Sequence, residues 1–198
     1  MLSVLIATNN RGKLREIQAL FENHPIHLIS PGALGLNLDV AETGATYAAN
    51  AALKAIAFAQ ASGMLALADD SGLEVEALNG APGVYSARYS PKPKATDADR
   101  RAHLLEQLAG RPHPWRARFC CTVALAAPEG TVQLVEGFCP GEIIPQERGH
   151  DGFGYDPIFL LPELGRTMAE LSMAEKNTLS HRARAILAAI PILEKMMP

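Results

Sequence analysis

The stretch Ala68-Asp69-Asp70-Ser71-Gly72-Leu73 decides how the rest of this sequence is interpreted. An apolar run over residues 64–68 precedes it and predicts a short buried strand that ends at the two aspartates. Ser71 and Gly72 then predict a turn. The alternation of apolar and acidic residues over 73–78 predicts a second, half-buried strand, and Asn79-Gly80 predicts the turn that closes it.

Two adjacent carboxylates beside buried strands are an unusual choice of residue. They repel each other and lose hydration, which is costly unless a cation or hydrogen-bond donors meet them. Carboxylate oxygens suit Mg²⁺, which proteins usually hold with one or two carboxylates together with substrate phosphates. The alternative is an ordinary solvated turn, because Asp, Ser and Gly are all favoured in turns.

Length and composition restrict the class of protein. The 198 residues predict one compact domain or two interlocked lobes, and 48% hydrophobic residues suffice for a sizeable core. A net charge of -3 gives no electrostatic case for a nucleic-acid or membrane surface, although a free nucleotide needs only a local basic cluster. Cys120, Cys121 and Cys139 form no CxxC pair, so free thiols in a reducing cytosol are expected. The apolar start is too short for a signal peptide, and no run is long enough for a membrane span.

The first strand is expected over residues 2–6, and helical spacing of apolar residues predicts a helix over 14–22. The loop between them, Thr8 to Lys13, matches neither a P-loop nor a Rossmann turn. A helix N-terminus nevertheless attracts phosphate, Asn9 or Asn10 can cap it, and Lys13 can reach an anion beside the cap. An ordinary capped helix with an exposed lysine is the alternative.

The remaining elements follow from periodicity and caps. Helices are expected over 47–60, capped by Thr46 and ended by Gly63, and over 97–108, capped by Thr96. Alternation over 117–125 and 132–138 predicts a long antiparallel hairpin. In the Gly-rich segment 149–157, an aromatic side chain could stack on a base or simply belong to the core. Ser180-His181-Arg182 opens the last helix and favours an anionic ligand there.

Four stretches together resemble the inosine/xanthosine triphosphate pyrophosphatase family, which cleanses nucleotide pools. They are Thr8-Asn9-Asn10-x-x-Lys13-x-x-Glu16, Ala68 to Leu73, Gly152-Phe153-Gly154-Tyr155-Asp156-Pro157, and Glu175-Lys176 through Ser180-His181-Arg182. Each is weak alone, but the ordered set is highly specific. The resemblance implies a single α/β domain over 1–198, with an elongated mixed twisted sheet, flanking helices and two lobes around a central substrate cleft. It also implies a cytoplasmic homodimer that binds neither nucleic acid nor membrane.

The implied reaction is Mg²⁺-dependent hydrolysis of ITP, dITP or XTP to the monophosphate and pyrophosphate. The resemblance implies that the triphosphate is bound by Thr8, Asn9, Asn10 and Lys13. Glu42 and Asp70 would hold the metal, with Asp70 also acting as the base for the attacking water and with Asp69 and Lys54 in support. Ser71 and Lys176 would contact substrate, Lys176 at the phosphates. The base pocket would be formed by Phe153, Gly154, Tyr155 and Asp156, closed by His181 and Arg182, with Arg182 donating to the purine oxo group. Ala49 stands where the family often has Glu, which puts any supporting role at that position in doubt.

The chemistry read from the residues agrees with this reaction. Phosphoanhydride hydrolysis needs charge neutralisation, a metal and an oriented water, and the chain supplies cations and carboxylates. It supplies no convincing serine–histidine or cysteine–histidine nucleophile. Two alternatives stay open: a septum-formation-type pyrophosphatase acting on dTTP or UTP, and a nucleotide-binding sensor without turnover.

Overall fold

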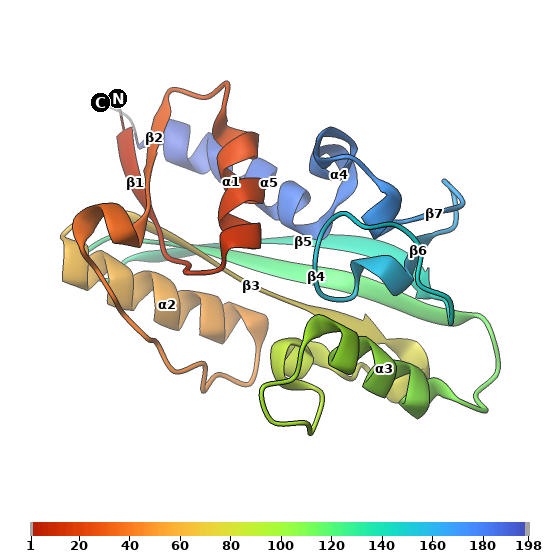
Figure 1. The fold of residues 1–198 in the computed structure, drawn as a ribbon. Helices are drawn as coiled ribbons and strands as arrows, with labels where there is room; N and C mark the ends of the chain where they lie inside the picture. Colours follow the sequence, from red (N-terminus) through yellow and green to blue (C-terminus); the bar gives the residue numbers. More distant parts are fainter. Residues whose placement is uncertain (1, 197–198) are drawn as a thin grey trace. The chain divides into compact units, whose positions relative to one another are not determined.

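The computed structural model describes residues 2–196, which form seven strands and five α-helices joined by loops and short 3-10 helices (Figure 1). The strands are β1 (Leu2–Ile6), β2 (Ile26–Ile29), β3 (Ala66–Val75), β4 (Trp115–Ala126), β5 (Val132–Ile143), β6 (Phe159–Leu161) and β7 (Arg166–Thr167). The α-helices are α1 (Arg11–Phe21), α2 (Tyr47–Ser62), α3 (Asp97–Leu108), α4 (Met173–Leu179) and α5 (His181–Lys195). Short 3-10 helices span Pro31–Leu34, Glu76–Leu78, Gly83–Arg88, Asp156–Ile158 and Met168–Glu170.

The strands pair in the order β2-β1-β3-β4-β5-β6-β7. β1 lies parallel to both β2 and β3, with Val4 opposite Leu28 and Leu5 opposite Ala66. β6 lies antiparallel to both β5 and β7. The sheet is therefore mixed and carries helices, which confirms the predicted α/β class.

The chain divides into two compact units, each described here by itself. The first unit contains residues 2–70, 121–137 and 181–196, and the second contains residues 71–120 and 138–180. The chain passes between them inside β3, β4 and β5, and again between α4 and α5. Each unit has its own hydrophobic core.

Two cores fill the first unit, because its parallel strands are apolar on both faces. Leu67 of β3 belongs to the core that α1 and α5 complete, and these two helices lie side by side in Figure 1. Ala66 and Ala68 belong to the other core, which α2 completes with alanines. Successive strand residues thus face α1 and α5 or α2 in turn, as the period of a strand requires.

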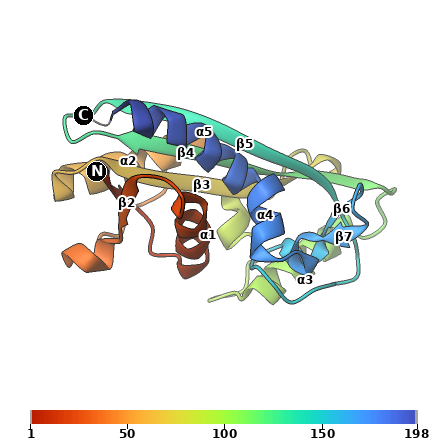
Figure 2. The same ribbon diagram turned by 90° about the horizontal axis from the view of Figure 1, so that it is seen from above.

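The second unit is built around aromatic side chains and α3. Leu104 and Leu108 of α3 pack with Leu73 of β3, and the rings of Phe119 and Phe159 are 4.3 Å apart. Figure 2 shows α4 beside β6 and β7, where Arg166 donates a 2.7 Å hydrogen bond to Glu175. This unit is therefore closed by short elements that the hydrophobic core holds together.

The structure confirms several predictions made from the sequence. Thr46 caps α2, Gly63 ends it in the left-handed conformation, and Thr96 forms a capping box with Asp99 at the start of α3. The three cysteines are free and buried. Among the described helices, none is long and apolar enough to cross a membrane.

The predicted turn after the aspartates is wrong. β3 runs without a break from Ala66 to Val75, so Asp69, Asp70 and Gly72 lie within one strand. The sequence signal failed because Asp, Ser and Gly favour turns only when no neighbouring strand pairs with them. The two carboxylates therefore do not share one strand end, and they point to opposite faces of the sheet.

Helix α4 and strand β7 were not predicted from the sequence. A signal for α4 was present, because Ser172 and Glu175 form a capping box with the S-x-x-E spacing. β7 has only two residues, which is too short for any periodicity to appear.

A glycine lets α5 lie close to β5. A Cβ atom on Gly137 would lie 2.2 Å from the carbonyl oxygen of His181 and 2.5 Å from the amide nitrogen of Ala185. Backbone atoms cannot swing aside as a flexible side chain can. The absence of a side chain at this position is therefore a condition for the packing of α5.

We expect Gly137→Ala to destabilise the protein by about 1–3 kcal/mol, the usual cost of forcing an extra carbon into a packed core. Gly32→Ala is the control, since a Cβ atom there would meet nothing within 4 Å. Urea unfolding of the two variants measures the difference. Equal stability of both variants would contradict the close approach.

Candidate active site

The two aspartates of β3 face different helices. Asp69 lies on the face covered by α1 and α5, where its carboxylate meets Lys13 and Arg182. Asp70 lies on the face covered by α2, where its carboxylate meets Asn50 and Lys54. Their side chains are buried, with residue exposures of 1% and 6%. One strand thus carries two separate charged clusters, one on each face.

The cluster around Asp69 is a buried ion network. Lys13 Nζ lies 2.9 Å from Asp69 Oδ2, and Arg182 Nε donates to the same oxygen at 3.1 Å. Arg182 Nη1 also pairs with Glu16, which lies one helical turn after Lys13 on α1. The two cations and two carboxylates balance in charge, which is the condition for burying them together.

The network fixes the protonation of its members. Burial alone would raise the pKa of Asp69, but Lys13, Arg182 and Lys54 together hold that pKa well below its usual value. Burial would lower the pKa of Arg182, but Asp69 and Glu16 raise it. Both groups are therefore charged at neutral pH, and Asp69 does not serve as a proton acceptor there.

The cluster around Asp70 is arranged differently. Asn50 Nδ2 donates to Asp70 Oδ2 at 3.1 Å, and Asn50 Oδ1 accepts the N–H of Gly44 at 2.8 Å. Lys54, one turn further along α2, lies 2.7 Å from Glu42 Oε1 and 3.7 Å from Asp70 Oδ1. Asn50 and Lys54 thus connect the loop that carries Glu42 to the carboxylate of Asp70.

The pKa of Asp70 shifts in the opposite direction from that of Asp69. Burial raises it, Glu42 adds to the rise, and Lys54, Lys13 and Asn50 oppose them without cancelling the effect. Neighbouring carboxyl groups whose environments separate their pKa values are a common sign of acid–base function. This arrangement favours Asp70 as the proton acceptor and Asp69 as a fixed charge.

The Asp70 cluster also fits a divalent cation. Asp70, Glu42 and Lys54 carry one more negative than positive charge, and Lys54 brings the two carboxylates close together. Among residues 2–196, no three acidic, histidine or cysteine side chains form a complete metal cage. Two carboxylates are what Mg²⁺ usually takes from a protein when phosphates supply further oxygens.

The N-terminus of α1 is capped as predicted, by Asn10. Its Oδ1 accepts the N–H groups of Gly12 at 2.8 Å and Lys13 at 3.1 Å, and Thr8 Oγ1 accepts the N–H of Asn10 at 3.2 Å. Asn9 donates to the carbonyl of Leu38 at 3.4 Å. Asn9 and Asn10 are exposed, and the cap leads directly to Lys13.

In the second unit, the Phe153 loop (residues 152–156) surrounds a buried ion pair. Asp156 Oδ2 accepts Lys176 Nζ at 2.7 Å and the N–H of Phe153 at 3.0 Å. Gly152 has a positive φ, and a Cβ atom there would lie 2.1 Å from the same oxygen. Lys176 Nζ lies 5.3 Å from the centre of the half-buried Phe153 ring.

The structure locates two further predicted residues. Lys176 lies beside Asp156 and Phe153, the residues expected at the base, and its expected contact with the phosphates stays a prediction. The Tyr155 ring is packed in the core and its hydroxyl donates to the carbonyl of Ser86 at 2.9 Å, so Phe153 is the aromatic side chain that the loop presents.

The structure distributes the predicted residues over the two units. The first unit brings together the clusters around Asp69 and Asp70 and the α1 cap; it contains Thr8, Asn9, Asn10, Lys13, Glu42, Lys54, Asp69, Asp70, His181 and Arg182. The second contains Ser71, Phe153, Gly154, Tyr155, Asp156 and Lys176. His181 and Arg182 are buried, with exposures of 5% and 2%, and the expectation that they close on a base stays a prediction.

Sequence reasoning gave no role to Glu16 or Asn50, although each holds a charged cluster together. Glu16 has a usable signal, because an acidic residue three positions after Lys13 shares its helical face. Asn50 could be suspected as a polar residue in an alanine-rich helix. Its two partners, Gly44 and Asp70, could not be inferred from spacing.

The mixed sheet with flanking helices and two buried charged clusters on one strand places the chain among the mixed α/β proteins. The family model of the Ham1 family matches residues 4–192. The chain belongs to the Ham1 family.

Individual relatives agree with that assignment. A protein of Desulforamulus reducens named dITP/XTP pyrophosphatase is 46% identical over 98% of this chain and 97% of its own. Another of Geobacillus kaustophilus, with the same name, is 49% identical over 94% and 91%. The solved structure of a HAM1 protein from Coxiella burnetii matches with a TM-score of 0.89 and 42% identity, covering 98% of this chain and 100% of that one.

We expect Arg182→Met to lower the free energy of unfolding by about 3–5 kcal/mol, because it leaves Glu16 and Asp69 without their shared buried cation. Arg15→Met is the matched control, on the exposed side of α1, and should change stability by no more than about 0.5 kcal/mol. Guanidinium unfolding at neutral pH measures both. A loss at Arg182 no larger than at Arg15 would show that the network does not stabilise the fold.

Proposed function

We propose that this chain hydrolyses dITP, XTP and ITP to the nucleoside monophosphate and pyrophosphate. The observation that carries the proposal is the pair of clusters on β3: a fixed Asp69 network and an Asp70 with a raised pKa beside Glu42 and Lys54. Membership of the Ham1 family and the names of its relatives support the substrate class. They do not favour the septum-formation alternative.

The chain's own residues account for the chemical step. A water attacks the α-phosphorus, Asp70 accepts its proton, and the bond from that phosphorus to the bridging oxygen breaks to release pyrophosphate. Lys54 and Lys13 oppose the negative charge of the phosphates, and the N-terminus of α1 adds the positive end of the helix dipole. Asn50 holds Asp70 in place through a hydrogen bond to its second oxygen.

Mg²⁺ belongs to this proposal. Glu42 and Asp70 would hold it, since their cluster carries the excess of negative charge. When bound, the cation supplies charge stabilisation to the phosphates. In the first unit, Asp69 lies on the opposite face of β3 from these two ligands, so its part is to hold Lys13 and Arg182 and not to bind metal.

Recognition of the base is proposed for the second unit. Phe153 offers an aromatic ring for stacking, which accepts every base, so selection must come from polar groups of the Phe153 loop. A homodimer and a cytoplasmic location, both implied by the family resemblance, complete the proposal.

Product analysis tests the reaction. With dITP or XTP and Mg²⁺, we expect pyrophosphate and the monophosphate, with ATP slower by about 10² to 10⁴, the discrimination that two unmatched buried polar groups allow. EDTA should abolish turnover. Orthophosphate as the first product would place cleavage at another bond, and tight binding without product would support a sensor.

Asp70→Asn separates function from stability. Turnover should fall by about 10² to 10⁴, the usual range for a positioned proton-transfer group. Because the fold raises the pKa of Asp70, its protonated form stabilises the fold at low pH, and this contribution is lost as pH rises through the folded pKa. A neutral amide should therefore leave the melting temperature in EDTA at neutral pH unchanged or higher.

Glu42→Gln is a second variant from the same cluster. It should weaken Mg²⁺ binding and so raise the Mg²⁺ concentration needed for half-maximal turnover. Near-normal turnover in Asp70→Asn would remove Asp70 from the mechanism. A lower melting temperature of Asp70→Asn in EDTA would show that the charge of Asp70 stabilises the fold.

A further inference from the structure

Helix α3 contacts the Phe153 loop at one residue, Gly154. The N–H of Gly154 donates to Asp97 Oδ2 at 2.8 Å, and the carbonyl of Gly154 accepts Arg101 Nη1 at 2.9 Å. Asp97 and Arg101 are four residues apart, so they project from the same face of α3. Helix α3 therefore binds both the N–H and the carbonyl of Gly154, the residue that follows Phe153.

Asp97 and Arg101 are themselves fixed by further ion pairs. Arg101 forms a bidentate pair with Glu147, with distances of 2.8 Å and 2.9 Å. Asp97 pairs with Arg100, whose other nitrogen donates to the carbonyl of Ala95 at 2.8 Å. Burial would raise the pKa of Asp97, but the N–H of Gly154 and the charge of Arg100 lower it, so the carboxylate is ionised at neutral pH.

The loop needs an external constraint because glycine supplies none. Gly152 and Gly154 both have positive φ, and glycine reaches such conformations and many others at little cost. Asp156 fixes the N–H of Phe153 from inside the loop. The contacts to Gly154 fix the peptide groups on both sides of that residue, so the backbone is held both before and after Phe153.

We propose that Asp97 and Arg101 are positioning residues that hold the Phe153 ring in place for the base of the substrate. The inference rests on the proposed function, because it assigns the base to this loop. Neither residue touches the reacting atoms, so their effect should fall on binding through the base and not on the chemical step.

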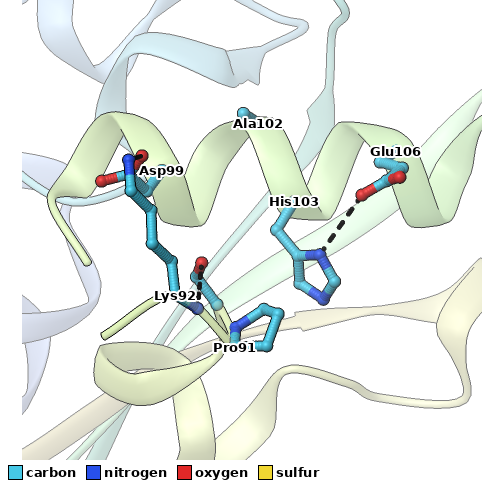
Figure 3. A pocket seen from close by; sticks show the side chains of 7 residues that line it. Pro91, Lys92, Asp99, Ala102, His103 and Glu106 are labelled. Carbon is cyan, nitrogen blue, oxygen red and sulfur yellow. Dashed lines mark hydrogen bonds and ion pairs between the residues drawn. The ribbon is translucent and has the colours of Figure 1, made fainter. Parts of the chain in front are cut away.

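The other side of α3 provides controls. Asp99, Ala102, His103 and Glu106 line a surface pocket of about 420 Å³ together with Ser90, Pro91 and Lys92 (Figure 3). Glu106 is exposed and contacts His103 at 3.5 Å. Glu106→Ala removes a carboxylate from the same helix without touching the loop, and Asp99→Ala removes the capping box and the ion pair with Lys92.

The experiment compares Asp97→Ala, Asp97→Asn and Arg101→Ala with these controls. The probes are dITP, which carries a base, and inorganic tripolyphosphate, which can compete with it through phosphates alone. Asp97→Ala and Arg101→Ala should each raise KM for dITP about tenfold, equivalent to about 1.4 kcal/mol, with kcat and the inhibition constant of tripolyphosphate nearly unchanged. Asp97→Asn keeps an acceptor for Gly154 and should recover most of the loss.

Glu106→Ala should behave as the wild type, and Asp99→Ala should lower the melting temperature without raising KM. Unchanged KM in both Asp97→Ala and Arg101→Ala would overturn the proposal. So would an equal loss for dITP and tripolyphosphate, because a general loss of structure affects both. Arg101→Ala covers the case in which Asp97→Ala fails to fold, since Asp97 lies in the first turn of α3.

Amide exchange at Gly154, followed in glycine-labelled protein, is independent of turnover. It should accelerate about tenfold or more in Asp97→Ala and stay unchanged in Glu106→Ala. If the wild type does not hydrolyse dITP, the proposed function fails, and the exchange rate still decides whether α3 holds the loop. Equal exchange rates in the wild type and Asp97→Ala would show that α3 does not hold the loop.

Discussion

The pairing of Arg182 with Asp69 and Glu16 is the interaction on which the first unit depends. Burying one carboxylate in a core is costly, and burying two beside each other is more so. Arg182 makes both possible, and Lys13 completes the balance of charge. The network connects β3 to the first turns of α1 and α5, so it fixes the helix end that carries the phosphate-binding candidates.

Strand geometry then gives Asp69 and Asp70 different properties. Because consecutive residues of β3 face opposite sides, Asp69 meets a neutralised network, whereas Asp70 meets Glu42 and one shared lysine. The same residue type is therefore held ionised at one position and made a better proton acceptor at the next. A turn at this place would have put both carboxylates into water, and neither property would follow.

The sequence was sufficient for elements that local chemistry determines. The caps of α2 and α3 and the strands of the long hairpin followed from spacing, because a helix end or an alternating strand is a local pattern. The pairing of strands that are distant in the chain could not be predicted from the sequence. β3 continues through Asp70 only because neighbouring strands pair with it. The partners of Arg182 lie on two other elements, β3 and α1, and Asn50 joins a loop to a strand, so these contacts needed coordinates. The family resemblance supplied the substrate class, which composition could not.

Separate cores have a consequence for how such a protein can evolve. The acidic clusters of β3 rest on the cores of the first unit, and the Phe153 loop rests on the core of the second. A substitution that repacks the second core can alter the loop without disturbing the residues around Asp69 and Asp70. If the Phe153 loop selects the base as proposed, selection for a different base could act on the second unit while the residues around Asp69 and Asp70 stay unchanged. Separate cores would then let the choice of substrate change independently of the hydrolytic chemistry.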